Sequence, residues 1–120
     1  YKRQINAMAE KKQKKAMELY YDLLALKEPP MRILYLITRQ FNLLMQVKEL
    51  SEEGYSAKTI SERLKMAGFI VRNCLRQAEY FSLKTLKEAL QDCVRMEEAV
   101  KTGRMNDVMS VELLLVKYSS

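Results

Sequence analysis

Residues 31–50 read "MRILYLITRQFNLLMQVKEL", and this stretch decides the fold of the 120-residue chain. Its first half is apolar nearly all round, which is typical of a helix surrounded by other helices. The preceding "KEPP" ends any earlier helix, because residues before proline avoid the helical region and Pro30 suits a first helical turn. The "SEEG" that follows offers Gly54 as a left-handed cap. We therefore expect a central helix over residues 31–50.

Apolar residues recur at helical spacing on both sides of this stretch. Only three Gly and two Pro occur in the chain, so few positions interrupt that spacing. The sequence predicts an all-α fold in a single domain over residues 1–120, a bundle of about six or seven helices joined by short loops. Besides the central helix, we expect helices over residues 5–9, 13–27, 57–64, a segment around 69–80, 83–101, and a last helix, "VMSVELLLVKY", capped by Asn106 or Asp107.

Two serines mark helix starts. Ser56 follows Tyr55, and Ser82 follows Phe81. A serine oxygen at an N-cap accepts a backbone N–H, and an apolar residue just before the cap packs on the first turn as a hydrophobic staple. We expect helices to begin directly after both serines.

The composition argues against an enzyme. The chain has no histidine, so the commonest general base is missing and a cysteine nucleophile would lack its usual partner. Cys74 and Cys93 without histidine make neither a zinc finger nor a zinc ribbon, and both are expected in the core. No Gly-rich phosphate loop is present. We expect no catalytic residue, no metal site and no cofactor.

The sequence also indicates where the protein resides. No run of 18 apolar residues occurs, so we expect no membrane-spanning helix. The first 15 residues are polar and basic, unlike a signal peptide. The sparse cysteine content suits an intracellular protein, and we expect a cytoplasmic one. Because the chain opens on Tyr1 rather than Met, we expect a C-terminal fragment of a longer protein.

Positive charge is concentrated at the start of the chain. The net charge is +6, and residues 1–15, a basic leading segment, account for +5 of it. The "KKQKK" run at residues 11–15 could contact phosphate or an anionic surface, although such runs more often lie on a solvated helix start. The body of the protein is therefore nearly neutral.

Residues 55–81, "YSAKTISERLKMAGFIVRNCLRQAEYF", have the pattern of a helix-turn-helix. One interpretation is the DNA-binding domain of a transcription regulator. Its second helix would then present four side chains that can read base edges in a major groove: Arg72, Asn73, Arg76 and Gln77. The other interpretation is a structural helix pair, which the modest net charge of +3 in this stretch favours.

Three stretches carry a family resemblance: "LALKEPPMRILYLITRQFNLLMQVKELSEEGYS", "LRQAEYFSLKTLKEAL" and "AVKTGRMNDVMSVELLLVKYS". Their hydrophobic spacing and local landmarks resemble the C-terminal domain of the delta subunit of the bacterial DNA polymerase III clamp loader. The landmarks are Arg39 and Gln40 before Phe41, the step Arg76, Gln77, Ala78, the pair Phe81 and Ser82, and Lys101, Thr102, Gly103. Many relatives enter the helix before Arg76 through a His-Pro pair, which this sequence lacks, so the start of that helix stays open.

The resemblance implies a helical collar that joins delta to the other clamp-loader subunits, of gamma or tau and delta prime type, in a five-membered ring. The sliding clamp would be contacted only through an N-terminal domain that this sequence does not include. Delta would be a non-hydrolysing accessory subunit, with weak or indirect contact to DNA and none to membrane. Residues 55–81 would then be a structural helix pair within the collar.

Two segments hold more apolar residues than one buried stripe requires, residues 35–41 and 113–118. The first is central, so burial explains it. The second lies at the end of the sequence, where fewer helices remain to cover it. We expect this last helix to contact neighbouring subunits through Leu113, Val116 and Tyr118. Docking of the helix into the domain's own core is the alternative.

Overall fold

The computed structural model describes residues 2–120. Over that range the chain forms seven helices and no strand, which confirms the predicted all-α bundle. The helices are α1 (Lys2–Ala9), α2 (Gln13–Ala25), α3 (Pro30–Glu52), α4 (Ala57–Leu64), α5 (Gly68–Ala78), α6 (Leu83–Lys101) and α7 (Asp107–Tyr118).

The serine caps explain why α4 and α6 begin at the predicted residues. Ser56 Oγ accepts a hydrogen bond from the backbone N of Thr59 at 3.3 Å, and Ser82 Oγ accepts one from Thr85 N at 3.0 Å. Each bond satisfies one of the N–H groups that a helix start leaves unpaired. Asn106 caps α7 in the same way, through Met109 N at 3.2 Å.

Other boundaries differ from the sequence-based prediction. The second helix ends at Ala25 rather than at residue 27, because Lys27 takes a left-handed φ of 62°. The central helix runs on to Glu52, and Gly54 then turns the chain with a φ of 98°. The open start of α5 lies at Gly68, after Ala67 in an extended conformation.

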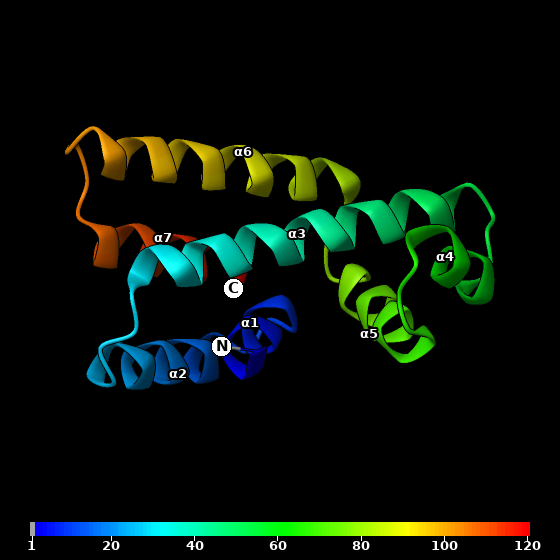
Figure 1. Cartoon of the computed structure of the whole chain (residues 1–120), viewed down its shortest axis with the longest axis horizontal. Coiled ribbons are helices and arrows are strands. Elements are labelled where there is room, and N and C mark those ends of the chain that lie inside the picture. The colour runs from blue at the N-terminus through cyan, green and yellow to red at the C-terminus, as the bar shows by residue number, and fades with distance from the viewer. Residues whose placement is uncertain (1) are drawn as a thin grey trace.

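α3 is the axis of the bundle. It crosses the middle of the molecule, with α6 along one side, α1 and α2 on the opposite side, and α4 and α5 at its C-terminal end (Figure 1). Helices pack against it from several directions, as the apolar first half predicts, but burial does not cover Tyr35, which is 64% exposed. Its buried side chains are Ile33, Leu34, Ile37, Phe41, Leu44 and Val47.

An aromatic cluster around Phe41 connects the central helix to the rest of the chain. The Phe41 ring lies edge-on to Phe81 at 5.8 Å between centroids and to Tyr118 at 5.2 Å. Lys11 Nζ lies 4.1 Å from the Phe81 centroid and donates a hydrogen bond to the Tyr118 backbone oxygen at 3.1 Å. The cluster therefore joins α3, α7, the α1–α2 turn and the segment between α5 and α6.

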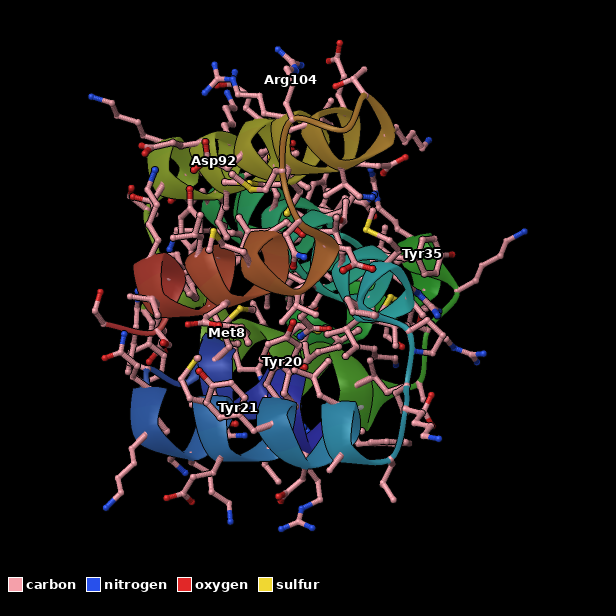
Figure 2. The ribbon with its side chains drawn as sticks, turned by 90° about the vertical axis from the view of Figure 1, so that its left-hand side faces the viewer. Met8, Tyr20, Tyr21, Tyr35, Asp92 and Arg104 are labelled. Carbon is pink, nitrogen blue, oxygen red and sulfur yellow. The ribbon has the colours of Figure 1, made fainter. Side chains whose placement is uncertain are left out.

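α7 lies between α6 and α2 (Figure 2). On the α2 side, the Tyr20 hydroxyl donates to the Val108 backbone oxygen at 2.7 Å. Gln13 Nε2 donates to the Val116 backbone oxygen at 2.9 Å. These two bonds fix α7 to α2 near both of its ends.

On the α6 side, Asp92 accepts hydrogen bonds from Lys117 Nζ at 2.7 Å and from the Tyr118 hydroxyl. Partial burial raises the pKa of Asp92, but the two hydrogen bonds and the positive charges of Lys117 and Arg95 outweigh burial. The net result is a pKa below the ordinary value. Burial and the Asp92 carboxylate raise the pKa of the Tyr118 phenol, so it stays a donor.

Both cysteines are free and buried, as predicted. Burial raises the pKa of Cys74, and it raises the pKa of Cys93 to about 11. Within residues 2–120, no three His, Cys, Asp or Glu side chains gather where they could bind a metal. None of the described helices combines the length and apolar character needed to cross a membrane.

Two substitutions of Tyr118 separate its ring from its hydroxyl group. We expect Tyr118→Ser to lower the free energy of unfolding by about 3–4 kcal/mol, because it removes a buried ring packed on Phe41. Tyr118→Phe keeps the ring and loses only the bond to Asp92, at a cost of about 1–2 kcal/mol. Urea unfolding followed by circular dichroism measures both values. Equal losses in the two variants would show that the ring contributes nothing.

Removing the Asp92 charge tests the α6–α7 connection. A carboxylate with a lowered folded-state pKa stabilises the fold above the unfolded pKa, and this contribution disappears as pH falls through the folded-state value. We expect Asp92→Asn to cost about 1 kcal/mol at neutral pH, allowing for partial exposure. The difference from wild type should shrink below pH ~4.

Urea titrations across this pH range provide the measurement. Asp22→Asn is the matched control, because Asp22 is exposed on α2. It should stay within ~0.5 kcal/mol of wild type at neutral pH. A cost of Asp92→Asn that did not change with pH would contradict the assignment.

Candidate subunit interface

The outer side of α7 carries an apolar stripe, which we call the α7 stripe: Met109, Leu113 and Val116. Their exposed fractions are 54%, 44% and 45%. Residues spaced by four and by three lie on one side of a helix. The other side of α7 packs into the core through Val111, Leu114, Leu115 and Tyr118. α7 is therefore apolar on two sides, and this chain covers only one of them.

Tyr21 of α2 is a further exposed apolar side chain in this region. It is 48% exposed and is labelled on α2, below α7, in Figure 2. Burial, together with the charge and hydrogen bond of Glu112 of α7, raises the pKa of the Tyr21 phenol. Exposed apolar side chains on helices that are fixed to each other mark candidate sites of protein interaction.

The structure separates the three predicted contact residues. Leu113 and Val116 lie on the α7 stripe, where a partner could reach them. Tyr118 is 2% exposed and belongs to the core, so its prediction as a surface contact needs correction. It follows Leu114 by four residues and therefore lies on the same buried side of the helix.

Two residues of this surface were missing from the sequence-based prediction, Met109 and Tyr21. The spacing of Met109, four residues before Leu113, could have identified it. No sequence pattern could have identified Tyr21, because its position beside α7 depends on how α2 packs.

The alternative, DNA-reading interpretation of residues 55–81 does not fit Gln77. Arg72, Asn73 and Arg76 lie at least partly exposed on α5, but Gln77 is 0% exposed. Its side chain accepts a hydrogen bond from Gln40 Nε2 at 2.7 Å and donates one to Asn6 Oδ1 at 3.0 Å. Gln77 therefore connects α5 to α3 and α1 and cannot reach a base edge.

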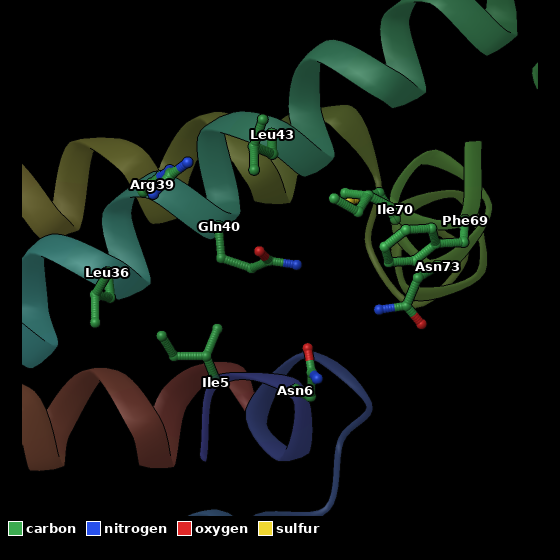
Figure 3. A pocket seen from close by; sticks show the side chains of 10 residues that line it. Ile5, Asn6, Leu36, Arg39, Gln40, Leu43, Phe69, Ile70 and Asn73 are labelled. Carbon is green, nitrogen blue, oxygen red and sulfur yellow. The ribbon is translucent and has the colours of Figure 1, made fainter. Parts of the chain in front are cut away.

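A cleft of about 550 Å³ lies between α1, α3 and α5 (Figure 3). We call it the α5 cleft. Its apolar lining comes from Ile5, Leu36, Leu43, Phe69 and Ile70, and its polar lining includes the amides of Asn6, Gln40 and Asn73. The cleft is separate from the α7 stripe, since no residue of α7 lines it.

Comparison with known proteins identifies the family. Residues 4–118 match the family described as DNA polymerase III delta subunit, C-terminal domain. The chain is 34% identical over 113 residues to DNA polymerase III subunit delta of Bacillus subtilis (strain 168), covering 94% of this chain and 33% of that protein.

A solved structure described as the Bacillus subtilis DNA clamp loader delta protein has the same fold, with a TM-score of 0.86 and 33% identity. The match covers 97% of this chain and 34% of that one. The chain therefore spans about a third of the length of the relatives it matches. The predicted resemblance is confirmed, and the chain belongs to the family formed by the C-terminal domains of DNA polymerase III delta subunits.

Proposed function

We propose that this chain is a subunit-assembly domain, the helical collar through which a delta subunit binds the other subunits of a clamp loader. The observation that carries the proposal is the α7 stripe. It is exposed on a helix that already supplies its own core side, so the domain's fold does not need it. Membership in the delta family supports other clamp-loader subunits as the class of partner, and we propose the gamma or tau and delta prime types.

The way α7 is held supports this role. Hydrogen bonds attach it to α2 through Tyr20 and Gln13 and to α6 through Asp92. A stripe on a fixed helix loses little conformational freedom when a partner covers it, and that lowers the cost of association. A partner that covered Met109, Leu113 and Val116 would remove apolar area from water.

In this role the domain would hold subunits together and would carry out no chemical step. Delta would act as a non-hydrolysing accessory subunit, and contact with the sliding clamp would be made by another part of the protein. DNA binding by this domain would be weak and indirect. Arg72 and Arg76 are exposed on α5 and can attract phosphate, but Gln77 is committed to the interior.

The first test introduces charge into the α7 stripe. We expect Leu113→Asp combined with Val116→Asp to remain folded, because both side chains are largely exposed. Association with partner clamp-loader subunits should weaken at least ~30-fold, since two unpaired charges would be buried in an apolar contact. Co-elution on size-exclusion chromatography and sedimentation measure association, and circular dichroism checks the fold.

Phe69→Ser is the matched control, because Phe69 is also an exposed apolar residue but lies on α5. It should assemble as wild type does. Assembly of the Leu113 and Val116 double variant at wild-type strength would refute the proposal. If the double Asp variant unfolds, association is measured instead with the milder double variant Leu113→Ser and Val116→Ser. A loss of several kcal/mol of stability there would assign the stripe to the core.

A second test concerns DNA. Titration with duplexes of unrelated sequence at two salt concentrations should show weak binding, the same for each sequence and weaker at high salt. Arg72→Ala and Arg76→Ala should weaken binding to all duplexes alike. A preference for one sequence that Arg72→Ala abolishes would instead support a DNA-reading domain.

A further inference from the structure

We propose that the α5 cleft binds a short segment of another protein in which apolar side chains stand among acidic ones. This site is separate from the proposed assembly surface, since its lining comes from α1, α3 and α5. The inference therefore does not depend on the proposed function. Three properties of the cleft support it: the shape of its apolar lining, its unused amide groups and the charge around it.

The apolar lining is accessible from solvent. Phe69, at the start of α5, is 62% exposed, although large aromatic side chains are usually well covered. Leu36 and Leu43 stand seven residues apart on α3, and Leu36 lies at the end of the cleft near Ile5, with Phe69 and Ile70 at the other end (Figure 3). A volume of about 550 Å³ holds several apolar side chains. The cleft thus offers anchoring positions for apolar residues of a partner.

Each of the three side-chain amides in the cleft uses one of its two polar groups, the oxygen or the nitrogen, in a hydrogen bond, and the other group remains unused. Gln40 donates through Nε2 to Gln77, so Gln40 Oε1 is left as an acceptor. Asn6 accepts from Gln77, and Asn73 accepts from Arg76, so their Nδ2 groups are left as donors. Among the side chains that the structure describes, those of residues 3–120, no hydrogen bond to these three remaining groups is found. A peptide main chain carries both C=O and N–H groups and can satisfy donors and acceptors together.

The charge around the cleft is positive. Among the described residues that line it, Arg39 is the charged one. α1 and α5 contain no acidic residue, and α3 has none before Glu49. Glu10, which directly follows α1, accepts a hydrogen bond from Gln77 Nε2 at 3.3 Å and is paired with Arg76 at 3.5 Å and Lys12 at 3.3 Å. Acidic side chains in the partner would complement this rim.

A protein segment fits this cleft better than nucleic acid does. Single-stranded nucleic acid is bound by basic grooves with successive aromatic rings on which bases stack. Among the lining residues that the structure describes, Phe69 is the one aromatic, and Ile5, Leu36, Leu43 and Ile70 are aliphatic. Such a lining matches apolar anchors, and Arg39 selects for acidic neighbours.

The experiment pans a phage-displayed library of random peptides on the purified chain. We expect the enriched peptides to combine leucine, isoleucine or phenylalanine with aspartate or glutamate. Labelled synthetic copies should shift the methyl resonances of Ile5, Leu36, Leu43 and Ile70. Phe69→Ser and Arg39→Glu should each weaken binding at least ~10-fold in fluorescence anisotropy.

Two control variants locate the effect. Arg104→Glu makes the same charge change as Arg39→Glu at an exposed position in the α6–α7 turn, and it should leave binding unchanged. The Leu113 and Val116 double variant should also bind peptide normally. The proposal is overturned if no peptide is enriched, if basic peptides are enriched, or if the methyl shifts lie elsewhere. It is equally overturned if labelled oligothymidylate produces the same shifts, or if Phe69→Ser prevents assembly with partner subunits.

Discussion

The Phe41 ring is the contact on which the other helices depend. It is fully buried near the middle of α3 and meets Phe81 and Tyr118, which lie 40 and 77 residues further along the sequence. Edge-on aromatic pairs contribute about 0.5–1.5 kcal/mol each beyond the burial of their area. Lys11 joins the cluster from the α1–α2 turn. Four segments distant in sequence therefore meet at one point, and the position of α7 follows from it.

This anchoring explains how the short helix α7 can hold an exposed apolar stripe in a fixed position. α7 has only twelve residues, and an isolated helix of that length is marginal in water. Its buried side and its bonds to Asp92 and Tyr20 supply the missing stability. The α7 stripe on the outward side is not needed for the fold of the domain. Because α7 is already fixed, covering its apolar stripe would cost little ordering entropy, which is consistent with the proposed role in assembly.

The sequence predicted the helices well where the signal was local. α4 and α6 begin and end at the expected residues, because Ser56 and Ser82 cap them through bonds to residues three positions away. It failed where the deciding contact was distant. In α7, periodicity groups residues by side but does not say which apolar side faces the core, so Tyr118 was placed on the surface. Local spacing also grouped Gln77 with Arg72, Asn73 and Arg76 in the alternative DNA-reading interpretation, because its hydrogen-bond partners Gln40 and Asn6 lie 37 and 71 residues away.

The hydrogen bonds of Gln77 fix the orientation of α5 and also affect the polar groups of the α5 cleft. Turning the Gln77 amide outward would break bonds to Gln40 and Asn6, and each buried polar group left unpaired costs about 1–3 kcal/mol. α5 is therefore fixed in orientation by its own interior contacts. The same bonds use one end of the Gln40 and Asn6 amides and leave the other end for the α5 cleft. The network that excludes a base-reading role thereby determines which groups the cleft offers to a partner.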